Sequence, residues 1–294
     1  MSPDPNAPPP ESAAAAERLS TGDPDLFLIP EEALPAGFAD RVESEGWEPA
    51  PAFPAATVLL LREGSAAPEA LLLRRHRRSG FAADAWVFPG GRVDAGDRDP
   101  ALASLLDGPS PEEWAERLSI ADPAEALSYV AAAIREAWEE TGIVLSPAGA
   151  GAGAGAVRRA LLADDVTLAE ASRREGVRYH TGELLYIAHW ITPEPEPRRF
   201  DTRFFLARAP KGAACDPHQA EITDFRWISA AKAVAGFEAG SLRLLPPTVH
   251  TLRRLAAFRS LDEVWEALRR APVPAILPRM RRHPQGVAIE LPRG

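Results

Sequence analysis

REAWEETGI, residues Arg135–Ile143, decides the fold of this chain together with GGRVDAGDRDPAL, residues Gly90–Leu102. On a helix that turns about 100° per residue, Glu136, Glu139 and Glu140 share one arc of roughly 100°. An adjoining apolar stripe is formed by Val130, Ile134, Ala137, Trp138 and Thr141. The pattern predicts a helix that buries this stripe and presents three carboxylates to a cleft.

Three clustered carboxylates repel one another, so they need a counter-charge. Hard divalent cations supply it, because Mg²⁺ prefers oxygen ligands and bridges readily to substrate phosphates. The acidic face therefore predicts a Mg²⁺ or Mn²⁺ site that polarises a phosphoryl group. The alternative is a solvated acidic face on which Arg135 is an ordinary ion-pair partner.

The loop VFPGGRVDAG, residues 87–96, places two glycines after a short strand, where the backbone can approach a ligand closely. The two pieces resemble the Nudix box: Gly, five residues, Glu, seven residues, then Arg-Glu-apolar-x-Glu-Glu-x-Gly-apolar. Gly91 opens the pattern, and Asp97 stands where the pattern has Glu. The second half is fitted by Arg135, Glu136, Ala137, Glu139, Glu140, Gly142 and Ile143. Residues 98–134 replace the seven-residue gap, and long surface insertions cost little closure entropy.

This resemblance implies an α/β fold, a Nudix-type α/β/α sandwich around a mixed sheet. It also implies hydrolysis of the diphosphate in a nucleoside diphosphate linked to another group. Glu139 and Glu140 match the main metal ligands, Glu136 a ligand or general base, and the Gly90 carbonyl a backbone ligand. Asp97 is expected to brace the box against Arg135.

Many family members use one more Glu from a distant loop, and Glu221 is the candidate here; the alternative is a surface acid at the start of a strand. The interrupted box is also similar to a subgroup that includes the peroxisomal coenzyme A diphosphatases of animals. That likeness is strengthened by WITP (Trp190–Pro193), RFDTRFF (Arg199–Phe205) and LPPT (Leu245–Thr248). Coenzyme A or acyl-coenzyme A is therefore the expected substrate.

Two groups of arginines are candidate phosphate ligands, because guanidinium forks match phosphate oxygens. The first follows the second predicted strand: Arg74, Arg75, Arg77 and Arg78. The second lies in and before RFDTRFF: Arg198, Arg199 and Arg203. For both groups the alternative is a solvated strand end.

The remaining sequence predicts strands interleaved with helices. A hairpin is expected over residues 56–62 and 69–75, and further strands over 183–192, 199–207 and 222–229. Ser110 with Glu113, and Asp122 with Glu125, signal helix starts, and Gly142 signals a helix end. The predicted organisation is a disordered tail at 1–24, a domain at 25–235 with a helical insertion at 98–126 that bulges from the box loop, and a C-terminal helical extension at 236–294. The run Ala148–Ala156 is predicted to be a flexible connector.

Composition narrows the function further. The net charge of −9 argues against a general nucleic-acid binder. The N-terminus has no secretory signal, the longest apolar run is too short for a membrane span, and the chain has a single cysteine, so a cytoplasmic protein is expected. The rival hypothesis to an enzyme is a Nudix-fold module that senses a nucleotide without cleaving it; a third is an acidic scaffold with no ligand. The oligomeric state is left open.

Overall fold

An eight-stranded mixed sheet forms the centre of the computed structural model, which describes residues 19–20, 23, 25–44, 48–77, 82–146 and 154–292. Its main path runs β11 (Ile222–Ser229), β4 (Glu69–Arg75), β3 (Ala52–Arg62), β10 (Arg199–Arg208), β9 (Leu185–Ile191) and β12 (Ala275–Ile276). Two short strands, β5 (Trp86–Val87) and β6 (Gly90–Arg92), pair with β4 and β3. β3 is parallel to β10 and antiparallel to β4, which confirms the predicted hairpin and the mixed sheet.

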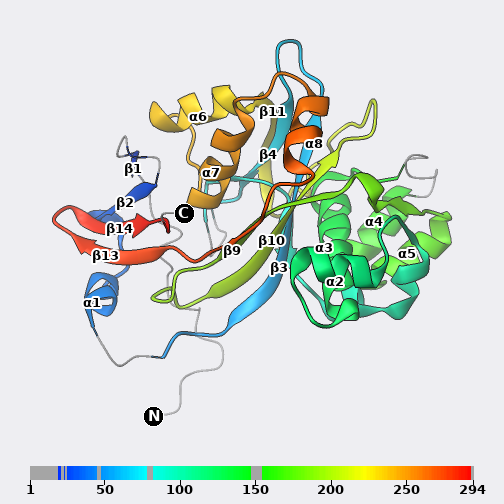
Figure 1. Ribbon diagram of the computed structural model, residues 1–294, viewed down its shortest axis with the longest axis horizontal. Helices are drawn as coiled ribbons and strands as arrows, with labels where there is room; N and C mark the ends of the chain where they lie inside the picture. The colour runs from blue at the N-terminus through cyan, green and yellow to red at the C-terminus, as the bar shows by residue number, and fades with distance from the viewer. Residues whose placement is uncertain are drawn as a thin grey trace.

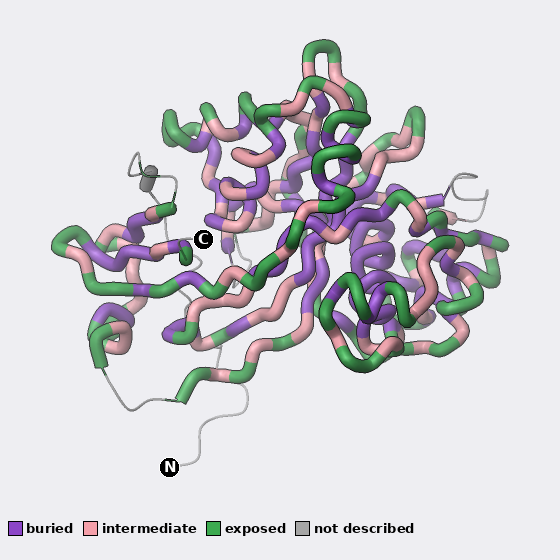
Figure 2. Tube along the Cα trace, viewed as in Figure 1, coloured by how far each residue is buried: buried purple, intermediate pink, exposed green. Residues whose placement is uncertain are grey.

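Both faces of this sheet are covered, because successive side chains of β3 enter different cores. Val58 and Leu60 join a core with α3 (Pro123–Thr141), whereas Leu59 and Leu61 join a second core with α7 (Pro246–Leu255) and α8 (Leu261–Leu268). A strand buried on both faces is continuously apolar, as Val58–Leu61 (VLLL) is. Figure 1 shows the two helical layers on either side of the sheet, and Figure 2 shows the purple, buried interior between them. The α/β/α sandwich is therefore confirmed.

The insertion is part of one core and not a detachable lobe. The short helix η3 (Ala95–Arg98) leads into it, and it contains the short helix η4 (Pro100–Ser104), strand β7 (Leu106–Asp107) and helix α2 (Pro111–Leu118). Trp114 of α2 is fully buried, and its ring meets Phe205 of the sheet edge-on at 6.0 Å between centroids. The expectation that the insertion merely bulges from the loop is wrong, because its large apolar side chains complete the core beneath α3.

Several helix signals are confirmed. Ser110 accepts a hydrogen bond from the Glu113 N–H, and the Glu113 carboxylate accepts one from the Ser110 N–H, which completes a capping box. Asp122 caps α3 through the Ala124 N–H, and α3 ends at Gly142 with φ +72°. Beyond α3 lie α4 (Ala154–Leu162), α5 (Leu168–Glu175), β8 (Tyr179–His180), which pairs with β7, and η5 (Thr181–Glu183). Of the predicted connector, residues 148–153 lie outside the described residues, and α4 begins at Ala154.

A second, four-stranded sheet joins the two ends of the chain. It runs β1 (Leu19–Ser20), β2 (Leu26–Pro30), β14 (Gly286–Glu290) and β13 (Arg279–His283), and η2 (Glu31–Ala33) and α1 (Phe38–Glu43) follow β2. The prediction of a disordered tail to residue 24 is wrong at Leu19–Ser20, which pair with β2; most of that tail lies outside the described residues.

The C-terminal extension is helical only in part. Helices α7 and α8 lie in this extension, but the chain then forms β12, β13 and β14, so the prediction of a helical extension to residue 294 is wrong for its last section. The predicted boundary at residues 235 and 236 falls inside α6 (Ala230–Glu238) and does not divide two units. Within the described ranges, every helix is too short or too polar to span a bilayer.

Candidate active site

The two halves of the box meet where β6 lies against the acidic face of α3. The Gly90 N–H donates to Oε2 of Glu140 at 3.1 Å. A Cβ atom on Gly91 would lie 2.2 Å from Oε1 of Glu136, and one on Gly90 would lie 2.6 Å from the Ala56 carbonyl. A side chain on Gly90 would clash with the backbone, and one on Gly91 would displace the Glu136 carboxylate, so the double glycine permits this close approach. The two halves of the box therefore form one site, although residues 98–134 separate them in the sequence.

Arg135 is the central cation of this site. Its Nε and Nη2 donate to the two carboxylate oxygens of Asp97, each at 3.0 Å. Nη1 donates to Glu136 at 2.9 Å and to Glu139 at 2.8 Å, and Nη2 also donates to the Arg92 carbonyl at 2.8 Å. The predicted brace between Asp97 and Arg135 is confirmed.

The shorter Asp97 reaches Arg135 because η3 brings it close. Asp97 also accepts a hydrogen bond from the Asp94 N–H at 2.8 Å, within the capping box of that short helix. Its side chain is buried, and burial raises the pKa of the carboxyl against the opposing effect of Arg135. Asp97 therefore ties the loop after β6 to the centre of α3.

Burial of the acids makes this cluster electrostatically costly. Burial raises the pKa of Glu136 to about 7, with a further contribution from Glu139 and an opposing one from Arg135. Burial, followed by the charge of Glu136, raises the pKa of Glu140 well above its ordinary value. Burial also raises the pKa of Glu139. One arginine does not neutralise three glutamates, so the face favours a further cation.

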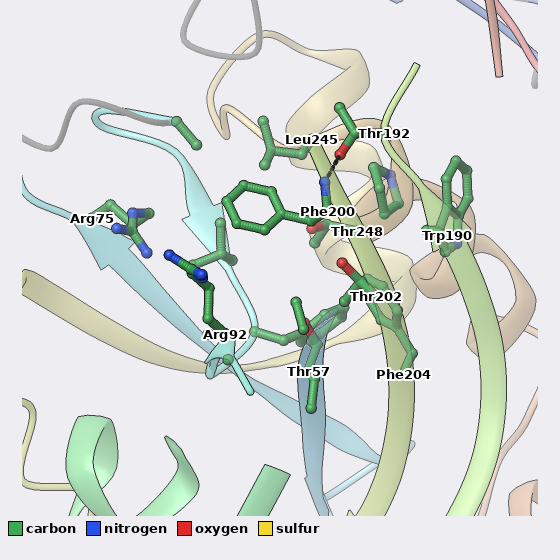
Figure 3. Close-up of a pocket in the computed structure, with 18 of the residues that line it drawn as sticks. Thr57, Arg75, Arg92, Trp190, Thr192, Phe200, Thr202, Phe204, Leu245 and Thr248 are labelled. Atoms are coloured by element: carbon green, nitrogen blue, oxygen red, sulfur yellow. Dashed lines mark hydrogen bonds between the residues drawn. The ribbon is translucent and has the colours of Figure 1, made fainter. Parts of the chain in front are cut away.

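All three glutamates line a cavity of about 470 Å³ that extends over the sheet toward α7. Gly90, Gly91, Arg75 and Glu221 line it too. Figure 3 shows Arg75 and Arg92 on one side of this cavity, and Trp190, Thr192 and Thr202 on the other. The site thus combines acids, three arginines (Arg75, Arg92 and Arg198) and an extended apolar surface.

Glu221 lines the same cavity as Glu140, and its charge contributes to the raised pKa of that carboxyl. Its backbone is fixed on both sides: the carbonyl accepts from the His76 N–H at 2.7 Å, and the N–H donates to the His218 carbonyl at 3.1 Å. The structure therefore brings Glu221 beside the box, and its role as a metal ligand stays a prediction.

The predicted arginines separate into two sets. Arg75 and Arg198 line the cavity, and the Nε of Arg75 is buried with no hydrogen-bond partner among the described residues. Arg74 instead donates to Asp84 at 2.8 Å, and the exposed Arg77 lies 3.8 Å from the same carboxylate. Arg78 lies outside the described residues.

The structure does not bring Arg199 and Arg203 to the cavity. Arg199 donates to the carbonyls of Thr192 at 3.0 Å and Ala50 at 2.8 Å, so it fixes the start of β10. Arg203 donates to the hydroxyl of Tyr186 at 3.2 Å. The cavity is lined by the alternate residues of β10, which are Phe200, Thr202 and Phe204. Because successive side chains of a strand point to opposite faces, the phosphate-binding expectation for Arg199 and Arg203 is not supported.

Sequence reasoning missed Arg92, although it directly follows Gly91. Arg92 lines the cavity, and its guanidinium lies over the ring of Phe53 at 4.2 Å. Thr57, Thr202 and Thr248 also add hydroxyl groups to the wall. The sequence signal that could have found the threonines is the alternation of side chains along a strand. Thr57 of β3 and Thr202 of β10 lie on the cavity face of the sheet, and Phe204 is the register partner of Thr57.

Among the described residues, no three His, Cys, Asp or Glu side chains stand in a ready-made metal-binding arrangement. The physical reason is visible in their contacts, because Arg135 binds Glu136 and Glu139 while Gly90 binds Glu140. Binding a cation would exchange some of these contacts for metal–oxygen bonds.

This fold and this rebuilt box define a Nudix protein. The sequence profile of the NUDT19 Nudix domain matches residues 53–255, which is more than half of the chain, so the chain belongs to that family. A solved structure of a Nudix hydrolase from Alicyclobacillus acidocaldarius is 26% identical, with a TM-score of 0.63 over 76% of this chain and 99% of that chain.

Two characterised relatives carry one name. The acyl-coenzyme A diphosphatase NUDT19 of Homo sapiens is 31% identical over 238 residues, which cover 66% of this chain and 62% of the human protein. The Gallus gallus protein of the same name is 30% identical over 241 residues, covering 67% of this chain and 63% of that protein. The chain thus spans somewhat less than two thirds of the length of these relatives.

Proposed function

We propose that this protein hydrolyses the diphosphate bond of a nucleoside diphosphate linked to a second group, with a divalent cation as cofactor. The observation that carries the proposal is the reassembled box, in which Gly90 binds Glu140 and Arg135 binds Asp97 although residues 98–134 separate the two halves. Arranged in this way, three glutamates line one cavity with three arginines.

The residues present suit Mg²⁺ or Mn²⁺, because both are hard cations that prefer oxygen ligands. Glu139 and Glu140 would hold the ion, with the Gly90 carbonyl and Glu221 as further donors, while Glu136 serves as the base. When bound, the cation would neutralise charge on the phosphoryl oxygens and lower the pKa of a bound water.

The reaction adds one water across the P–O–P bridge. The water oxygen forms a bond to one phosphorus, the bridging P–O bond to that phosphorus breaks, and two phosphate monoesters leave. We assign the proton of this water to Oε2 of Glu136, whose Oε1 accepts from Arg135. Arg135 acts through Glu136 and Glu139 as a positioning residue. Arg75 and Arg92 reach the cavity and bind substrate phosphate oxygens.

Coenzyme A or an acyl derivative is the substrate we propose. The residues of WITP and LPPT all line the cavity, as do Phe200, Thr202 and Phe204 of RFDTRFF, so the three motifs converge on one space. The relatives named above are acyl-coenzyme A diphosphatases. Coenzyme A carries a 3′-phosphate besides its diphosphate, and Arg75, Arg92 and Arg198 offer three cations. A cytoplasmic location and the absence of nucleic-acid and membrane partners stay predictions.

The test compares kcat/KM for coenzyme A, dephospho-coenzyme A, ADP-ribose, NADH and UDP-glucose with Mg²⁺. We expect coenzyme A to be cleaved to 3′,5′-ADP and 4′-phosphopantetheine. Dephospho-coenzyme A should be poorer by about 1.5–3 kcal/mol, because one charge-assisted contact is lost. Preference for any of the last three compounds would overturn the coenzyme A assignment but not the hydrolase. Tight binding without cleavage would establish the sensor alternative.

A further inference from the structure

The cavity continues across the sheet, well beyond the carboxylates. In one row of the sheet Arg92 of β6 pairs with Ala55 of β3, Ala55 with Thr202 of β10, Thr202 with Trp190 of β9, and Trp190 with Ile276 of β12. Neighbouring strands lie about 4.8 Å apart, so the three steps from Arg92 to Trp190, the members of this row that line the cavity, span roughly 14 Å. The cavity therefore holds more than a diphosphate.

The far wall of the cavity comes from the C-terminal hairpin. Met280 of β13 and Ile289 of β14 are register partners, and both line the cavity together with Pro278. Figure 1 shows the chain leaving α8, passing β9 and continuing into this hairpin. All three residues lie beyond residue 255, outside the segment that the family profile matches.

The hairpin is firmly attached at two places. Strand β12 pairs with β9 through Ile276 and Trp190, just before Pro278. Strand β14 pairs with β2, where Ile289 is the partner of Phe27. Met280 therefore lies in a segment that is anchored to both sheets, and the residue is 9% exposed. Because the hairpin is anchored at both places, it fixes how far the cavity extends in this direction.

We propose that Met280 forms the wall of an apolar subsite for the end of the non-nucleotide arm, and that it determines which acyl groups are accepted. The inference rests on the proposed function and deepens it. Pro278, Met280 and Ile289 offer no polar side-chain group, whereas the cations of the cavity lie in or near β4, β6 and β10. A nucleobase needs hydrogen-bond partners at its edge, but an acyl chain needs only apolar contact.

Met280 suits an adaptable wall, because an unbranched thioether side chain fits differently shaped ligands. Substitution with Trp should shorten the subsite, substitution with Ala should lengthen it, and Met280→Leu should leave it nearly unchanged. Arg281→Ala is the matched control, because Arg281 is the next residue of β13 and is exposed, with its ion pair to Glu290 at 3.0 Å.

The experiment measures kcat/KM for coenzyme A and for octanoyl-coenzyme A in all four variants, and the Kd of both ligands by calorimetry. We expect Met280→Trp to lower kcat/KM for octanoyl-coenzyme A by about tenfold or more, since a pocket discriminates by this factor for a poorly fitting apolar group. Coenzyme A itself should change by less than about twofold. Met280→Leu and Arg281→Ala should preserve the wild-type ratio, and thermal unfolding checks that each variant is folded.

The outcomes distinguish the inference from the proposed function. If both compounds are cleaved and their ratio is the same in every variant, the subsite is overturned while the hydrolase stands. If Met280→Trp weakens both compounds equally, the nucleotide occupies this end and the subsite is also overturned. If neither compound is cleaved, the proposed function fails, and the Kd values still decide the subsite: equal changes for both ligands reject it.

Discussion

Helix α3 and the arginine-bearing strands β4 and β10 differ in how well a residue type indicates its function. On α3, all three glutamates of the motif line the cavity. Among the six predicted arginines that are described in β4, in β10 and at their immediate ends, Arg75 and Arg198 line it; Arg74, Arg77, Arg199 and Arg203 do not. The helical motif fixes the relative positions of its side chains, whereas a cluster of like residues on a strand is divided between two faces.

The difference arises from the side-chain periodicity of a helix and of a strand, more than from the charge of the residues. Residues spaced by three and four positions stay on one side of a helix, so three acids in REAWEE must face one space. Neighbouring arginines on a strand point in opposite directions, and Arg74 and Arg75 show this directly: one pairs with Asp84 and the other enters the cavity. Local patterns therefore place helical ligands more securely than strand ligands.

The largest effect is expected from removing the cation that holds α3 to the box loop. Arg135→Ala leaves Asp97 and Glu136 buried without their partner, and breaking a buried pair in this way costs about 3–5 kcal/mol. Chemical denaturation should show this loss in the free energy of unfolding. Arg62→Ala, which breaks an exposed pair with Glu69, is the control and should cost less than about 1 kcal/mol. Equal losses would contradict the central role of Arg135.

The second effect concerns the metal-binding face itself. Glu139→Gln and Glu140→Gln should each lower kcat by about a hundredfold or more, because charge stabilisation of the transition state is lost. EDTA should abolish turnover, and added Mg²⁺ or Mn²⁺ should restore it. Glu125→Gln, on the first turn of the same helix, should keep wild-type turnover, since Glu125 does not line the cavity. Full activity in either box variant would reject the assignment.

The third effect sharpens the contrast between adjacent arginines of β4. Arg75→Ala should raise KM by an amount equivalent to about 1.5–3 kcal/mol, because a phosphate contact is lost. Arg74→Ala should leave KM within about twofold, since it removes only a partly exposed ion pair with Asp84. Steady-state kinetics with coenzyme A decide the matter. A larger increase in KM for Arg74→Ala than for Arg75→Ala would contradict the placement of Arg75 in the cavity and Arg74 outside it.

The smallest effect tests a helix start in the insertion. Ser110→Ala removes the hydrogen bond from the Glu113 N–H, which should cost about 1 kcal/mol of stability. Turnover should be unchanged, because Ser110 is remote from the cavity lining. Thermal unfolding and kinetics on the same preparation separate the two properties, and a loss of kcat without a loss of stability would show that the insertion takes part in catalysis.

Much of the fold was predictable where the signal is local. The hairpin of β3 and β4, the caps at Ser110 and Asp122, and the end of α3 at Gly142 follow from short sequence patterns. The second sheet was not predicted, because β14 pairs with β2 from the opposite end of the chain and neither strand has a nearby turn signal that reveals the pairing. Arg92 was missed for a similar reason: its place in the cavity depends on the pairing of β6 with β3.

The most direct test of the central claim is a Mn²⁺ titration followed by electron paramagnetic resonance, with wild type, Glu140→Gln and Glu125→Gln compared at equal concentration. If the interrupted box forms one cation site on α3, wild type and Glu125→Gln will bind Mn²⁺ saturably with the same affinity. Glu140→Gln will bind about tenfold or more weakly, because one anionic oxygen ligand is lost. Identical titration curves for all three proteins would contradict the claim that the glutamates of α3 hold the cofactor.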